Sequence, residues 1–63
     1  MKEDPDMGYL KAVANVLATD GNAIVRTKNI KKVIKTLEKN FGIKTIEIEK
    51  VLPENQRYIE LVT

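Results

Sequence analysis

Residues 30–41 repeat apolar and basic side chains at the three- and four-residue spacing of an α-helix. One side of the expected helix is apolar, and its residues are Ile30, Val33, Ile34, Leu37 and Phe41. The opposite side is basic, with Lys31, Lys32, Lys35 and Lys39. Thr27 or Asn29 can cap its start, and Gly42 suits the left-handed residue that ends many helices. Such a helix must bury its apolar side on another layer of structure and turn its lysines to solvent.

A first helix is expected over residues 5–19. Asp4 can cap the free backbone N–H groups, and Pro5 fits the first helical position, where no hydrogen bond is lost. The apolar residues of this stretch recur at helical spacing and are Tyr9, Leu10, Val13, Val16 and Leu17. The run Asp20-Gly21-Asn22 then predicts a stop and a turn.

Three short stretches predict strands. Ala23-Ile24-Val25 is a continuous apolar run after a turn, which favours a buried strand. Residues 46–49 alternate as a half-buried strand does, with Glu47 and Glu49 facing solvent. Pro53-Glu54-Asn55 predicts a turn, and residues 57–62 alternate again, with Ile59 and Leu61 on one face. The last third is therefore expected to be a hairpin.

The expected fold is an α/β two-layer sandwich of order α-β-α-β-β, a single domain over residues 1–63. It has a three-stranded mixed sheet with two helices on one face. The strands before and after the second helix should be parallel neighbours or near-neighbours. A winged helix is the rival fold, since it also ends in a hairpin. It needs two helices before that hairpin, and residues 27–42 contain no break between two helices.

Composition adds that the core is small. A chain of 63 residues buries only about 60% of the surface that its unfolded form exposes. It has no cysteine and no histidine, so neither a disulfide nor a zinc site can reinforce it. Self-association is the remaining reinforcement, and a homodimer is expected. No apolar stretch reaches the ~20 residues of a membrane span, and the polar, acidic start predicts a cytoplasmic protein.

Positive charge is concentrated in one segment. Seven basic side chains and the single acid Glu38 lie between Arg26 and Lys44, although the whole chain has a net charge of only +2. A concentrated field of this kind attracts phosphate backbones. Lys28 and Asn29 also precede a helix N-terminus, where N–H groups favour anions. The candidate nucleic-acid-binding residues are Arg26, Lys28, Asn29, Lys31, Lys32 and Lys35. The alternative is a solvated helix surface without a ligand.

Catalysis has little material in this chain. There is no His, Cys or Ser to form a nucleophile–base pair, and no Gly-rich phosphate loop or EF-hand spacing. We therefore expect no catalytic residue, no metal site, no cofactor and no small-molecule substrate.

The order and spacing of several stretches resemble the Alba family, the small archaeal DNA- and RNA-binding chromatin proteins. The similar stretches are Pro5–Ala14, Ala23–Lys28, Ile30–Leu37, Asn40-Phe41 and Ile46–Glu49. The resemblance covers about residues 5–62. It implies binding of DNA or RNA, association with the nucleoid if the ligand is DNA, and a homodimer or a heterodimer with a paralogue. It also implies an association surface at Phe41. Tyr58, opposite Ile59 and Leu61 on its strand, is a second candidate for that surface.

Three departures from that family favour an alternative function. Only residues 1–4 precede the first expected helix, where the family has a strand. Glu3 and Asp4 stand where the family has a lysine pair that contacts nucleic acid. The turn at residues 52–56 is short, where the family has a long basic arm. The alternative is a protein-interaction or dimerisation module of the same fold that does not bind nucleic acid.

Overall fold

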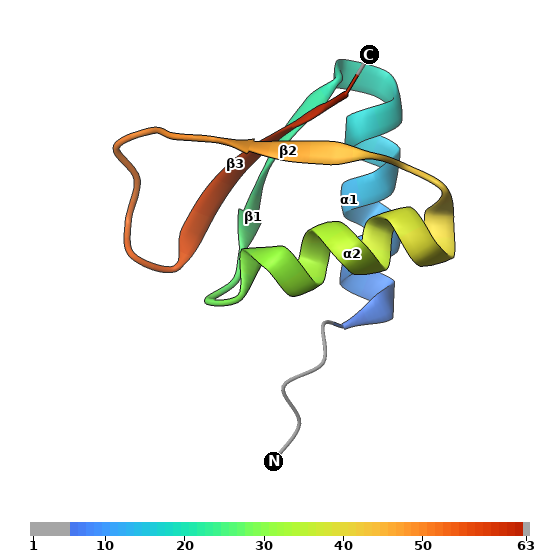
Figure 1. Ribbon diagram of the computed structural model, residues 1–63, viewed down its shortest axis with the longest axis horizontal. Helices are drawn as coiled ribbons and strands as arrows, with labels where there is room; N and C mark the ends of the chain where they lie inside the picture. The colour runs from blue at the N-terminus through green and yellow to red at the C-terminus, as the bar shows by residue number, and fades with distance from the viewer. Residues whose placement is uncertain (1–5, 63) are drawn as a thin grey trace.

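The structure, a computed structural model, describes residues 6–62 and has the expected order of elements (Figure 1). The helices are α1 (Met7–Asp20) and α2 (Ile30–Phe41), and the strands are β1 (Asn22–Arg26), β2 (Thr45–Ile48) and β3 (Gln56–Leu61). Because α2 is one unbroken helix, the chain is not a winged helix. The α-β-α-β-β order is confirmed.

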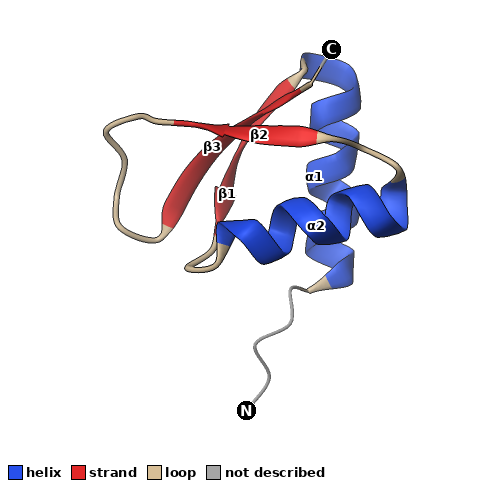
Figure 2. Cartoon of the chain, viewed as in Figure 1, coloured by secondary structure: helices blue, strands red, loops and turns tan. Residues whose placement is uncertain are grey.

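The three strands form one sheet in the order β1-β3-β2, shown in red in Figure 2. β3 lies in the middle and is antiparallel to both neighbours. The strands on either side of α2 therefore run parallel to each other as near-neighbours, as expected. The expected mixed sheet is wrong, since both hydrogen-bonded pairs are antiparallel. The reason is that β3, returning from the hairpin, inserts between the two strands that α2 connects.

Both helices pack on the same face of this sheet, α1 against β1 and α2 against β2. One core lies between the layers and includes Leu10 and Leu17 of α1, Val25 of β1, Leu37 of α2 and Ile59 of β3, each 0% exposed. The two-layer arrangement is confirmed.

The first helix begins later than the sequence predicts. Asp6 is the N-cap, and its carboxylate Oδ1 accepts a hydrogen bond from the Gly8 N–H at 3.0 Å. The expected start at Pro5 is therefore wrong, because the Asp6 carboxylate satisfies the first-turn donors and leaves Met7 as the first helical residue. The expected cap Asp4 lies outside the described residues. At the other end Gly21 has φ +84°, so the predicted stop is confirmed.

The second helix begins and ends as predicted. Asn29 is its N-cap, with its side-chain oxygen accepting from the Lys32 N–H at 3.3 Å. Thr27 supports the cap, because its hydroxyl accepts from the Asn29 N–H at 3.0 Å. Gly42, at φ +67°, ends the helix.

The sheet register differs from the expectation for β2. Opposite residues share a face, and Glu47 stands opposite the buried Ile59. Glu47 therefore lies on the helix side, whereas Ile46 lies on the open face and is 50% exposed. The cause is Ile43, which packs against the core just after α2; alternation from it turns Thr45 inward and Ile46 outward.

The expectation for β1 fails in the same way. Ala23 and Val25 are buried, but Ile24 between them is 51% exposed. The apolar run is thus not buried on both sides, because the described residues cover only one face of the sheet.

Candidate nucleic-acid interface

The lysines of α2 face solvent because its apolar side is committed to the core. Val33 and Leu37 are 2% and 0% exposed. Lys31, Lys35 and Lys39, on the opposite side of the helix, are exposed, and Lys32 is half-buried. The lysine face expected from the sequence is therefore formed. We use "lysine face" below for Lys28, Lys31, Lys32, Lys35 and Lys39.

Most of this charge is not neutralised by the described part of the chain. Lys28, Lys31, Lys35 and Lys39 form no ion pair with any residue in 6–62. Glu38 is the only acid on α2. Like charges gathered without counter-charges produce a positive potential that extends into solvent and attracts polyanions.

The N-terminal end of α2 adds a second source of positive potential. A surface hollow of about 420 Å³ lies there, lined by Asn29, Lys31, Lys32 and Lys35. The first-turn N–H groups of a helix and its dipole both favour an anion at this end. The side chain of Asn29 is already used as the cap, so Asn29 shapes the end of the helix and is not available for base readout through its oxygen. Lys28 is exposed in the preceding loop.

Arg26 is not brought together with these lysines. It stands opposite Gln56 at the end of β1, and the buried Val25 before it points to the helices. Side chains alternate along a strand, so Arg26 points to the open face of the sheet. The basic segment 26–39 is thus divided between two faces of the molecule.

Phe41 and Tyr58, the residues expected at an oligomer interface, lie on different sides of the sheet. Phe41 is half-buried and packs against the core at the end of α2. Tyr58 lies on the open face beneath Lys50, whose Nζ is 4.3 Å from the ring centroid. Partial burial, followed by the neighbouring Glu60 carboxylate, raises the pKa of Tyr58 above its ordinary value. Their role in association stays a prediction.

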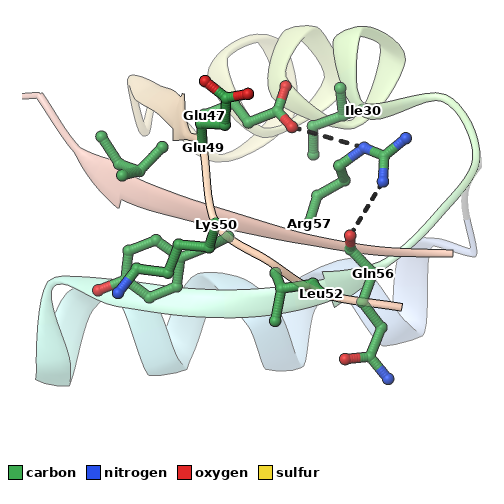
Figure 3. A pocket seen from close by; sticks show the side chains of 9 residues that line it. Ile30, Glu47, Glu49, Lys50, Leu52, Gln56 and Arg57 are labelled. Carbon is green, nitrogen blue, oxygen red and sulfur yellow. Dashed lines mark hydrogen bonds and ion pairs between the residues drawn. The ribbon is translucent and has the colours of Figure 1, made fainter. Parts of the chain in front are cut away.

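A feature that the sequence did not predict is the ion pair of Arg57 with Glu47, at the edge of a pocket of about 370 Å³ (Figure 3). Arg57 Nε lies 3.4 Å from Glu47 Oε2. Its Nη1 donates to the carbonyl oxygens of Glu54 and Gln56 at 2.9 and 3.0 Å. The only sequence signal for this pair is the alternation of residues in β2. Taken alone, that alternation places Glu47 on the solvent side of the sheet, which is the wrong face. The arginine closes the hairpin loop, and this role is structural.

The described residues hold no group of three His, Cys, Asp or Glu side chains that could bind a metal ion. Within 6–62, neither helix has the length and apolar character needed to cross a membrane. Comparison of the chain with known proteins finds no matching family model, no matching curated protein and no matching solved structure.

Proposed function

We propose that this protein binds nucleic acid, DNA or RNA, through its lysine face and without sequence preference. The observation that carries the proposal is the set of exposed lysines on α2 that no described acid neutralises. The resemblance to the Alba family supports the same function. The proposal includes a cytoplasmic protein, associated with the nucleoid if the ligand is DNA.

The spacing of the lysines fits a phosphate backbone. Lys31, Lys35 and Lys39 are four residues apart on one side of α2, so the row extends about 12 Å at 1.5 Å per residue. A DNA strand carries one phosphate per about 3.4 Å of axis, so the row spans about three or four phosphates. Each lysine is a flexible point charge and needs no fixed geometry at the phosphate.

Base readout is not expected at this surface. Specific contacts to base edges depend mostly on bidentate Arg, Asn or Gln side chains. Arg26 points to the other face of the sheet, and Asn29 is engaged as the helix cap. Contacts should therefore go to the backbone, which orients a protein without reading sequence.

The test is a fluorescence anisotropy titration of a labelled DNA duplex and a labelled single-stranded RNA. Neutralising about three phosphates gives a logarithmic salt slope of about −2.7 for the DNA duplex and about −2.1 for the single-stranded RNA. From 50 to 200 mM salt, affinity should therefore fall about forty-fold for the duplex and about twenty-fold for the RNA. Lys31→Glu with Lys35→Glu should abolish binding, because the two reversals remove four units of charge from the row.

The matched control is Lys11→Glu with Lys44→Glu, which makes the same change in net charge at two exposed lysines outside the lysine face. It should retain most of the affinity. Binding that is insensitive to salt, or an equal loss in both double variants, would contradict the proposal.

The second candidate function is a protein-interaction or dimerisation module that does not bind nucleic acid. It is favoured by the apolar open face of the sheet, where Ile24 and Ile46 are 51% and 50% exposed. For this function Lys31→Glu with Lys35→Glu should leave association with a protein partner unchanged, and neither DNA nor RNA should bind at any salt concentration.

A further inference from the structure

The open face, the side of the sheet opposite the helices, presents one aromatic ring between two aliphatic side chains. Ile24, Tyr58 and Ile48 stand in one row across β1, β3 and β2. β3 is the middle strand, so the Tyr58 ring lies away from both edges of the sheet. Both helices pack on the other face, which leaves this row open to solvent, and Ile24 is 51% exposed.

The charged residues of the open face are mostly basic. Alternation along the strands places Arg26 and Lys44 on this face, and the Lys50 ammonium lies over the Tyr58 ring. Glu60 is the one acid that the described strands add to it. Three cations against one acid give a local charge of +2, and within residues 6–62 neither Arg26 nor Lys44 forms an ion pair. The open face is therefore complementary to a polyanion.

An aromatic ring surrounded by cations suits an unpaired strand of nucleic acid. A base of a single strand can stack on the ring while the cations pair with the flanking phosphates. In a duplex each base is already stacked on its neighbours, so a duplex gains only the contacts to phosphate. A surface of this kind therefore distinguishes single strands from duplexes without reading their sequence.

We propose that the open face binds a single strand of nucleic acid, with one base stacked on the Tyr58 ring and the flanking phosphates paired with Arg26 and Lys50. The inference rests on the proposed function and deepens it. The lysine face holds the phosphates of any nucleic acid, and the open face adds a contact that only an unpaired strand makes.

The two surfaces are joined at one corner of the molecule. Arg26 ends β1 on the open face, and Lys28 lies in the loop between β1 and α2, where it is exposed. Two residues of chain span at most about 7 Å, so these two cations are close neighbours. A strand bound along the lysine face can pass Lys28 and Arg26 and reach Tyr58 without leaving positive charge.

In the structure Lys50 occupies the position that a base would take. Its Nζ is 4.3 Å from the centroid of the Tyr58 ring (Figure 3). An exposed contact between a cation and a ring is worth about 2- to 5-fold in an equilibrium constant, whereas a stacked base is worth about 5- to 150-fold. The base therefore displaces the ammonium. Lysine has a long, flexible stem, so the displaced charge can pair with a phosphate beside the stacked base.

The first experiment separates bases from phosphates. Fluorescence anisotropy measures the binding of labelled oligothymidine of about eight nucleotides, within the usual site sizes, and of an abasic strand of the same length. Both strands carry the same phosphates, so the wild type should bind oligothymidine about 5- to 150-fold more tightly. Equal affinities overturn the proposal. Oligouridine should bind like oligothymidine, because neither proposed contact involves the 2′-hydroxyl group; binding of only one of the two also overturns it.

The second experiment changes the ring. Tyr58→Leu should weaken oligothymidine binding at least about five-fold and remove the preference over the abasic strand. Tyr58→Phe is the matched control and should bind as the wild type does, since stacking needs the ring and not the hydroxyl group. Both variants should keep the duplex affinity and the circular dichroism spectrum of the wild type. Equal losses in the two variants overturn the proposal; if Tyr58→Leu does not fold, the abasic comparison in the wild type decides.

Charge variants test the path of the strand. Arg26→Gln should reduce the salt slope for oligothymidine by about 0.7, the contribution of one phosphate, and leave the duplex slope unchanged. Lys11→Gln, at an exposed lysine of α1 outside both surfaces, should change neither slope. Glu60→Gln should strengthen oligothymidine binding, because it removes the acid beside the stacked base. Weaker binding by Glu60→Gln, or equal slope changes for Arg26→Gln and Lys11→Gln, would contradict the proposed path.

The duplex distinguishes failure of this inference from failure of the proposed function. If only the inference fails, the duplex still binds and Lys31→Glu with Lys35→Glu abolishes this binding, but Tyr58→Leu has no effect on any strand. If the proposed function fails, neither the duplex nor oligothymidine binds, or the double reversal has no effect. A second copy of the chain is the other possible occupant of the open face. A dimer in sedimentation equilibrium that Ile24→Lys disrupts and oligothymidine does not would assign the face to that copy and overturn the proposal.

Discussion

Tyr58 lies on the open face of the sheet, between Ile24 of β1 and Ile48 of β2, and is bordered by opposite charges. The Lys50 ammonium lies over its ring, and the Glu60 carboxylate is nearby on the same face of β3. Burial raises the pKa of Tyr58, and the Glu60 carboxylate raises it further through a side-chain hydrogen bond and through its charge. Both favour the neutral phenol, so the folded chain holds this proton more tightly than the unfolded chain does. Stability should therefore fall as pH rises above about 10.

We predict that Glu60→Gln lowers the pKa of Tyr58 toward its ordinary value, because it removes the negative charge that opposes ionisation. The measurement is the absorbance at alkaline pH in a Tyr9→Phe background, where Tyr58 is the only phenol. A midpoint that does not move, or moves upward, would show that Glu60 does not act on this group.

At the scale of the elements, both helices end at a glycine in the left-handed region, and their starts are fixed by Asp6 and Asn29. The caps set where α1 and α2 begin. The two glycines set where these helices stop, and so where β1 and β2 can begin. The position of the lysine face depends on this, because Asn29 and Gly42 fix which residues of the second helix meet the sheet.

We predict opposite effects for two glycine substitutions. Gly42→Ala should destabilise the protein by about 1–2 kcal/mol, the cost of a left-handed L-residue. Nothing lies within 4 Å of the added Cβ, so the cost is that of the backbone alone. Gly8→Ala should stabilise by up to about 1 kcal/mol, because Gly8 is inside α1 at negative φ and its Cβ would be 3.5 Å from Asp6 Oδ1, an ordinary contact. Urea unfolding measures both; the same sign for the two would refute the explanation.

At the scale of the whole molecule, one small core holds two layers together. Ile59, at the centre of the middle strand, is 0% exposed and packs in the cluster that includes residues of both helices. A domain of this size has a free energy of unfolding of about 3–9 kcal/mol. A single large core deletion can therefore remove most of the stability.

We predict that Ile59→Ala lowers the free energy of unfolding by about 2–5 kcal/mol, the range for large-to-small core substitutions. Val51→Ala, at a fully exposed residue of the hairpin loop, should change it by less than about 0.5 kcal/mol. Thermal unfolding followed by circular dichroism at low protein concentration compares the two. Equal effects would mean that the core is not where the structure places it.

The amino-acid sequence by itself determined the elements and their order. These signals are local, because each relates residues only a few positions apart along the chain. They are the periodicity of residues 30–41, the cap Asn29 and the two glycines. The lysine face follows from the same periodicity. The start of α1 was misplaced because Asp4 and Asp6 are both good caps, and local propensity does not choose between them.

Only the tertiary structure decided the strand order and the faces. Inserting β3 between β1 and β2 is a long-range choice that no local pattern encodes. A shift of one residue along a strand exchanges its two faces, so the packing of Ile43 against the core was enough to turn Ile46 outward and Glu47 inward. Alternation along β1 likewise places Arg26 on the open face of the sheet, away from the lysines. Ile24, Ile48 and Tyr58 lie side by side on that face, because side chains from three distant segments meet only after the sheet has formed.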